Sequence, residues 1–217
     1  MQQELRLQKN LMEKIKYLYG ASGHGKVVVD ILKSKNIIIS GILDDNPKIE
    51  FMSNIPVLKF VETKISSDNE IIISIGDNRI RKKIASNLNT SFFTALHASS
   101  IISEYATIKK GSVVMAGVII NSSVKIGEHC IINSGAIIEH DCEIGNYCHI
   151  SPNASLAGNV NVGEGTHIGI GACIIQGVKI GKWVTIGAGS VIINDIPDFA
   201  VVVGNPGKTI KFNIANE

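Results

Sequence analysis

Residues 129–152 read HCIINS GAIIEH DCEIGN YCHISP when they are written in groups of six. The same period extends over residues 105–194, where fifteen consecutive groups hold an aliphatic residue in fourth place and a small residue (Ala, Ser, Val, Cys or Thr) in second place. A helix cannot keep one face apolar at a period of six, whereas a coil of short strands, three to a turn, points the second and fourth residues inward. The sequence therefore predicts a parallel β-helix with five turns over this stretch.

Three consequences follow from this coil. Residues eighteen apart should stack on one wall, with neighbouring turns about 4.8 Å apart. Glycine recurs in fifth place, where we expect the backbone to turn a corner and a Cβ to be costly. Three of the four cysteines, Cys130, Cys142 and Cys148, occupy second places and are predicted to be small core residues, and no CxxC pair suggests a zinc ribbon.

The first half of the chain has a different rhythm. A strand at 15–20, a glycine-rich turn and a helix at 24–35 are followed by a strand at 37–45, a strand ending near 78 and a helix at 79–88. This alternation predicts a Rossmann-like α/β domain over residues 13–97 and a coil domain over residues 98–217 whose tail, from residue 196, caps the last turn. Residues 1–11 are predicted to be an extension with no part in the fold.

Composition sets limits on partners. The 217 residues are 45% hydrophobic and 18% charged, with a formal net charge of +2, which is ordinary for a soluble protein and provides no basic stripe for nucleic acid. No apolar run approaches the roughly 18 to 20 residues of a membrane span, and the first residues lack the apolar core of a signal peptide. We therefore expect a cytoplasmic protein with no membrane contact.

The stretch GASGHGK at residues 20–26 joins a predicted strand to a predicted helix, where free N–H groups favour a phosphate. Val27 stands where a P-loop needs Ser or Thr, which argues against nucleotide hydrolysis, and the spacing GxxGxG differs from that of dinucleotide sites. Asp44 and Asp45 come 19 and 20 residues after Gly25, at the end of a predicted strand. An acid at such a strand end can bind a ribose hydroxyl. A mononucleotide-linked ligand is favoured over the alternative, a tight turn beside a solvated acidic loop.

Histidines are the candidate catalysts. In EHDC at residues 139–142, His140 can take a proton near neutral pH and Asp141 can orient it, the alternative being an ordinary surface histidine. His149 and His167 are eighteen apart and should stack, which raises a metal hypothesis. The zinc histidines of γ-class carbonic anhydrases include a pair five apart, and since this chain has no such pair in the coil we expect no metal.

The order of GASGHGK, LDD, SIGDNRIRKKI, EHDC, CHIS, AGNV and GNPGK resembles the nucleotide-sugar N-acetyltransferases of the family that makes N-acetylated bacillosamine, along almost the whole chain. Sialic acid O-acetyltransferases and perosamine N-acetyltransferases are relatives of similar build. The resemblance implies a left-handed parallel β-helix, acetyl-CoA as co-substrate, and a homotrimer whose acceptor site lies between one chain's first domain and a neighbour's coil. At third places on the outer walls, Val113, Ile119, Ile131 and Ile137 are candidates for that interface.

The resemblance also implies roles for individual residues. His140 is the general base, and Asp141, shorter than the Glu of relatives, supports it. The acetyl-CoA site comprises His149 and Gly158 at the thioester and Ile170 and Ala188 along the pantetheine arm. The site for the uridine diphosphate end of the sugar comprises Ser22, Gly23, His24, Asp44 and Asp45, with Asn78 as a further candidate.

The implied reaction is direct. The amine of a UDP-linked 4-amino-4,6-dideoxy-N-acetylhexosamine, deprotonated by His140, attacks the acetyl carbonyl, and CoA leaves as the thiol. The alternatives are O-acetylation of a sugar such as sialic acid, an acetyl-enzyme on Cys142, which its inward place disfavours, and a sensor or scaffold without catalysis.

Overall fold

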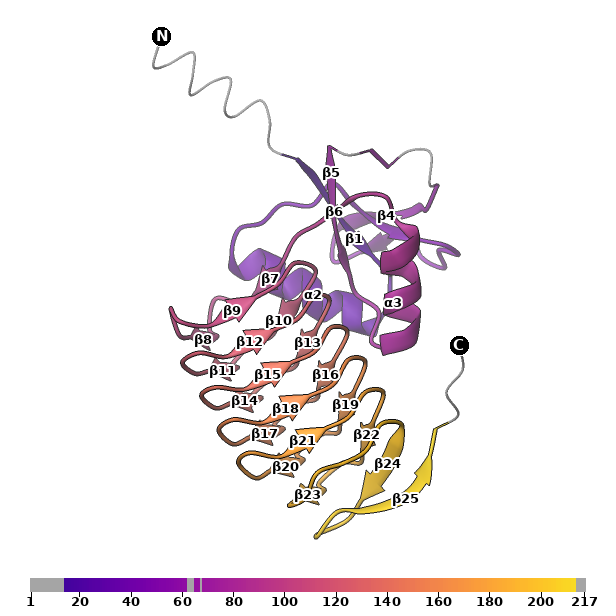
Figure 1. Ribbon diagram of the computed structural model, residues 1–217. Coiled ribbons are helices and arrows are strands. Elements are labelled where there is room, and N and C mark those ends of the chain that lie inside the picture. The colour runs from indigo at the N-terminus through magenta and orange to yellow at the C-terminus, as the bar shows by residue number, and fades with distance from the viewer. Residues whose placement is uncertain (1–13, 62–64, 67, 214–217) are drawn as a thin grey trace.

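The computed structural model describes residues 14–61, 65–66 and 68–213. Figure 1 shows an α/β part at one end of a long coil of short strands. The predicted extension at residues 1–11 lies outside the described residues. In the part of the chain that is described, neither helix is long and apolar enough to cross a membrane.

The α/β part is a six-stranded sheet in the order β3-β4-β2-β1-β5-β6, parallel throughout except for β3 against β4. Its strands are β1 (Ile15–Tyr19), β2 (Gly41–Asp44), β3 (Phe51–Met52), β4 (Ile55–Lys59), β5 (Asn69–Ile73) and β6 (Ser91–Phe92). Its helices are α2 (Gly23–Ser34) and α3 (Asn78–Asn87). The predicted strands and helices are confirmed, whereas the hairpin of β3 and β4, turned by Ser53 and Asn54 at positive φ, was not predicted.

The coil has three walls of parallel strands. Wall 1 contains β7 (Ala95–Leu96), β10 (Val113–Val114), β13 (Ile131–Ile132), β16 (His149–Ile150), β19 (His167–Ile168), β22 (Thr185–Ile186), β24 (Ala200–Val203) and the antiparallel β25 (Lys208–Phe212). Wall 2 contains β8 (Ile101–Ile102), β11 (Ile119–Ile120), β14 (Ile137–Ile138), β17 (Ser155–Leu156), β20 (Cys173–Ile174) and β23 (Val191–Ile192). Wall 3 contains β9 (Thr107–Ile108), β12 (Lys125–Ile126), β15 (Glu143–Ile144), β18 (Asn161–Val162) and β21 (Lys179–Ile180).

The six-residue period is confirmed. Each of the fifteen groups contributes one strand at its third and fourth places, and partners on a wall are eighteen residues apart, as in the pairing of Ile131 with His149. The fourth-place side chains form the core of the coil. Strand β7 begins this coil at Ala95, slightly before residue 98, and the division into domains 13–97 and 98–217 stays a prediction.

The prediction that a Cβ is costly at the fifth-place glycines is confirmed, and the cost comes from close packing of the turns, not from the φ angle. The left-handed residue at each corner is the first-place residue, such as Asp141 at φ +62, while the fifth-place glycines have no positive φ. A Cβ on Gly163 would lie 2.5 Å from the carbonyl carbon of Gly181 in the next turn. Glycine is therefore required there by the close approach of two backbones.

Helix α2 packs on the first strands of wall 1. Its apolar residues share one buried cluster with Ala95, Val113, Met115 and Ile131. The prediction that Val113 and Ile131 face a neighbouring chain is therefore wrong, since α2 of the same chain covers them. Ile119 and Ile137 lie on wall 2, away from this helix.

Substituting Gly163→Ala should destabilise the coil by about 3 kcal/mol, because two backbones must separate to admit the methyl group. Urea unfolding measures the loss. The control is Gly171→Asn at a first-place corner with φ +63 and open space, a place that Asn153 and Asn159 occupy in other turns. The control should lose less than about 1 kcal/mol, and equal losses would contradict the account of the fifth place.

Candidate active site

The loop between β1 and α2 is a tight turn that opens onto the first turn of the helix. Ser22 caps α2 by accepting a hydrogen bond from the Gly25 N–H, and its hydroxyl donates to the Ser74 carbonyl. A Cβ on Gly25 would lie 2.6 Å from the Gly20 carbonyl, so this glycine is needed by the turn itself. A Cβ on Gly23 would meet open space. The N–H groups of this helix end therefore border free volume, as an anion site requires.

The two acids after β2 have different environments. Asp44 accepts hydrogen bonds from the N–H groups of Ala21 and Asn46, so its carboxylate orders the glycine loop. Asp45 accepts from the Tyr19 hydroxyl at 2.5 Å; burial of Tyr19, together with this bond, raises the pKa of the phenol well above its usual value. A cavity of about 680 Å³ is lined by Tyr19 and Asp45 together with Phe60 and Lys83. Its aromatic and charged lining suits a nucleoside.

Three histidines lie where the α/β part meets wall 1. The rings of His149 and His167 stack with centroids 4.8 Å apart, which confirms their predicted alignment, and Nε2 of His149 lies 3.0 Å from Asn133 Nδ2. Burial lowers the pKa of His149 to about 3, with smaller contributions from the charges of His167, Arg81 and His24. Burial likewise lowers the pKa of His24 to about 4. Burial also lowers the pKa of His167, so all three imidazoles are neutral near pH 7.

Two of these rings each have a nitrogen without a hydrogen-bond partner among the described residues. These atoms, His24 Nε2 and His149 Nδ1, are buried. An unpaired buried nitrogen is costly, so His24 Nε2 is suited to a partner from a bound molecule. For His149 the backbone of Gly76 is close enough to act on the imidazole, where it partly offsets the effect of burial on the pKa. Over the same described ranges, no three His, Cys, Asp or Glu side chains are placed to hold a metal ion.

Asn78, which is predicted to contact substrate, has hydrogen-bond partners within the chain at both ends of its amide. Its Nδ2 donates to the carbonyls of Gly165 and Thr166 in the coil, and its Oδ1 accepts from Arg81 Nη2. The prediction overlooked Arg81, which is buried. The available signal was helical spacing, since Asn78, Arg81 and Ala85 are three and four residues apart and are the buried residues of α3.

His140 and Asp141 lie at the corner between walls 2 and 3. His140 Nδ1 is 2.8 Å from Asp141 Oδ2, and the two side chains are 62% and 59% exposed. Asp141 is therefore long enough to pair with the imidazole. When Nδ1–H donates to the carboxylate, the lone pair on Nε2 is free to accept a proton.

Gly158 lies directly against this imidazole. Gly158 is one turn of the coil after His140, and a Cβ there would be 2.6 Å from Cε1 and 2.7 Å from Nε2 of His140. Glycine at this place therefore makes room for the imidazole ring. Cys142, two residues from His140, is buried, and its Sγ donates to the Ala157 carbonyl. Burial raises the pKa of this thiol, which argues against an acetyl-cysteine intermediate.

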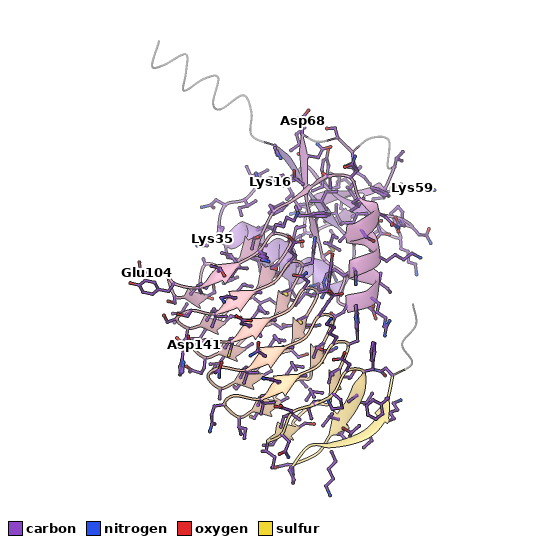
Figure 2. The ribbon with its side chains drawn as sticks, viewed as in Figure 1. Lys16, Lys35, Lys59, Asp68, Glu104 and Asp141 are labelled. Atoms are coloured by element: carbon purple, nitrogen blue, oxygen red, sulfur yellow. The ribbon has the colours of Figure 1, made fainter. Side chains whose placement is uncertain are left out.

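Ile170 and Ala188 stack at the third corner, between walls 1 and 2. Ile170 is 54% exposed, and the neighbouring Gly171 and Gly189 have open space beside them. This corner is bare enough for an extended chain to lie along it. Figure 2 shows Asp141 at the edge of the coil opposite α3. The predicted residues thus gather in three separate places on the chain.

Comparison with known proteins gives two matches to family models. Residues 17–88 match the PglD N-terminal domain, and residues 123–158 match the bacterial transferase hexapeptide (six repeats). The UDP-N-acetylbacillosamine N-acetyltransferase of Bacillus subtilis (strain 168) is 39% identical over 108 residues, which are 46% of this chain and 50% of that protein. The alignment thus spans half the length of this curated relative.

Solved structures match over more of the chain. One match is a variant of the perosamine N-acetyltransferase from Caulobacter crescentus in which one histidine is replaced by asparagine, in complex with CoA and GDP-perosamine. It is 35% identical with a TM-score of 0.85, and the match covers 91% of this chain and 97% of that one. The acetyltransferase domain of PglB from Neisseria gonorrhoeae FA1090, in complex with acetyl coenzyme A, is 35% identical with a TM-score of 0.86, covering 91% and 100%.

Substituting Gly158→Ala should displace the His140 imidazole, because the new methyl group needs the space of Cε1 and Nε2. The ring is an exposed side chain, so the fold should tolerate its movement and the melting temperature should change little. If His140 is a general base, turnover should fall about 100-fold or more. Full activity in a folded variant would show that the observed ring position is unimportant.

Stability should fall as the pH is lowered from about 6.5 to 4. Burial lowers the pKa of His129 in the folded chain to about 4, so over this range the unfolded chain binds a proton that the folded chain does not. The His129 ring stacks on Tyr147 and meets Phe92 edge to face, so His129→Phe should keep the packing and remove this contribution. Its melting temperature should drop about 4 to 8 °C less than that of the wild type between pH 7.5 and 5. An equal drop in melting temperature for the variant and the wild type would show that His129 is not the source of this pH dependence.

Proposed function

Because the chain belongs to the family of hexapeptide-repeat nucleotide-sugar N-acetyltransferases, we propose that it transfers the acetyl group of acetyl-CoA to the amine of a nucleotide-linked amino sugar. The observation that carries this proposal is the His140–Asp141 pair, an exposed imidazole oriented by a carboxylate at 2.8 Å. We further propose that the reaction takes place in the cytoplasm.

The chemistry is an acyl transfer with one base. His140 Nε2 accepts a proton from the sugar amine as the nitrogen attacks the thioester carbonyl, and Asp141 stabilises the imidazolium that forms. The tetrahedral intermediate carries a negative oxygen, for which the Gly158 N–H and the neutral imidazole of His149 are the proposed donors. The intermediate then collapses, the bond from carbon to sulfur breaks, and CoA leaves as the thiol with the proton from His140.

The acceptor is proposed to be held by its nucleotide. Ser22, Gly23 and His24 would surround the diphosphate at the start of α2, and the nucleoside would occupy the cavity beside Asp45. A UDP-linked 4-amino-4,6-dideoxy-N-acetylhexosamine is the proposed sugar. The pantetheine arm of acetyl-CoA would lie along the bare corner at Ile170 and Ala188.

A homotrimer would complete the site. The nucleotide loop and His149 lie at wall 1, whereas His140 projects from the corner between walls 2 and 3 of the same chain. We propose that His140 of one chain acts on an acceptor held by its neighbour. The apolar third places of wall 2, with Ile101 66% exposed, provide surface for packing the chains around a three-fold axis.

Substituting His140→Ala should lower turnover by about 10²- to 10⁴-fold, the usual contribution of a general base. The measurement is thiol release from acetyl-CoA with UDP- and GDP-linked 4-amino sugars and with free sialic acid. Release with one amino sugar supports the proposal and names the substrate. Release with sialic acid alone would favour the O-acetyltransferase alternative, and no release with any acceptor would refute transfer to these sugars.

Co-expression of His140→Ala with His149→Ala tests the composition of the site. Each variant alone should be nearly inactive. In mixed trimers, about one site in four receives both intact histidines if they come from different chains. Activity that stays at the level of the single variants would place both residues of each site in one chain.

A further inference from the structure

Arg81 is a buried cation whose hydrogen-bond partners are neutral. It lies in α3 and is 1% exposed. Its Nε donates to the His129 carbonyl, and its Nη1 donates to the carbonyls of Ile75 and Gly76. Its Nη2 donates to Asn78 Oδ1 and to the carbonyls of Tyr147 and Cys148. Burial lowers its pKa to about 10, so it remains charged near pH 7.

These contacts join two segments that bear on the proposed reaction. On one side, Ile75 and Gly76 follow Ser74, whose hydroxyl donates to the Gly20 carbonyl at the start of the glycine loop. Ser74 also accepts, through its carbonyl, from the hydroxyl of Ser22 in that loop. On the other side, the Cys148 carbonyl belongs to the peptide unit that leads directly into His149. The Arg81 guanidinium therefore connects the segment beside the glycine loop, Ile75 and Gly76, to the backbone that precedes His149.

We propose that Arg81 is a positioning residue, which fixes the separation between the nucleotide-binding loop and His149 and so aligns the acceptor amine with the thioester. This inference rests on the proposed function and adds to it a residue that contacts neither substrate. The amine is tethered to a nucleotide held by one part of the chain, and the thioester is contacted by the other. A displacement of about 1 Å between such groups can cost about 100-fold in rate.

Arginine suits this role better than lysine. The planar guanidinium presents five N–H donors in fixed directions, which allows it to bond to carbonyls on both sides at once. A lysine ammonium has three donors at a single point, so it cannot span the same set of carbonyls. Arg81→Lys therefore keeps the charge and most of the volume while it removes the bridge.

The experiment compares Arg81→Lys and Arg81→Met with the wild type. Lys82→Met is the matched control, because Lys82 makes a partly exposed ion pair with Glu164 across the same joint, from the same helix. For each folded protein the measurements are kcat, the KM of the nucleotide-sugar acceptor, and the Kd values of CoA and of the free nucleoside diphosphate. Circular dichroism and size-exclusion chromatography establish folding and assembly.

Arg81→Lys should lower kcat by about 100-fold, while the two Kd values change by less than about threefold. Lys82→Met should keep kcat within about twofold of the wild type. The inference is overturned if Arg81→Lys keeps its kcat, if kcat and both binding constants decline together with the melting temperature, or if neither variant folds. A wild-type chain that acetylates no acceptor would refute the proposed function itself, before any variant is compared.

Discussion

The packing of the α/β part on the coil depends on a charged group that has no counter-ion among its hydrogen-bond partners. Removing a guanidinium from water costs several kcal/mol, and here the compensation comes from backbone carbonyls and one amide oxygen. Carbonyls at the end of β5 and at the corners of wall 1 all point to Arg81. Since those carbonyls are fixed by the sheet and by the coil, the guanidinium can bond to all of them only at one relative placement of the two parts. These hydrogen bonds therefore fix the position of the α/β part on the coil more precisely than the apolar contacts of α2 alone would.

The coil uses small polar side chains in a comparable way. At successive second places on the corner between walls 3 and 1, Ser112, Cys130, Cys148 and Thr166 each donate to the carbonyl fifteen residues later. These carbonyls belong to fifth-place glycines, which are free of side chains where the turns approach. The inward second place is thus a column of donors that ties one turn to the next, and the cysteines are part of that column. This corner is also the one against which Arg81 and Asn78 are placed.

The sequence was informative where a structural rule repeats. The period of six places one aliphatic residue in every group, so the coil, its walls and the stacking of His149 on His167 could all be predicted. The corners were harder to predict, because the left-handed first place is held by His129, Tyr147 and Trp183 as well as by glycine. No partner for Arg81 could be predicted, because most of its partners are backbone carbonyls. Every residue has a backbone carbonyl, so the sequence does not show which ones the guanidinium contacts. Likewise, no pattern indicated that Val113 and Ile131 would be covered by α2.

The two histidines nine residues apart differ because the coil places them in different surroundings. His149 is on wall 1, covered by the α/β part, and burial lowers its pKa to about 3, so its imidazole stays neutral and suits a role as a hydrogen-bond donor. His140 is at an open corner, where water reaches the ring and Asp141 can stabilise the cation. A proton acceptor must be able to hold the charge that it acquires, whereas a donor to a developing oxyanion must keep its proton. The fold separates these requirements by wall, and the proposed trimer would bring a His140 and a His149 from different chains to one substrate.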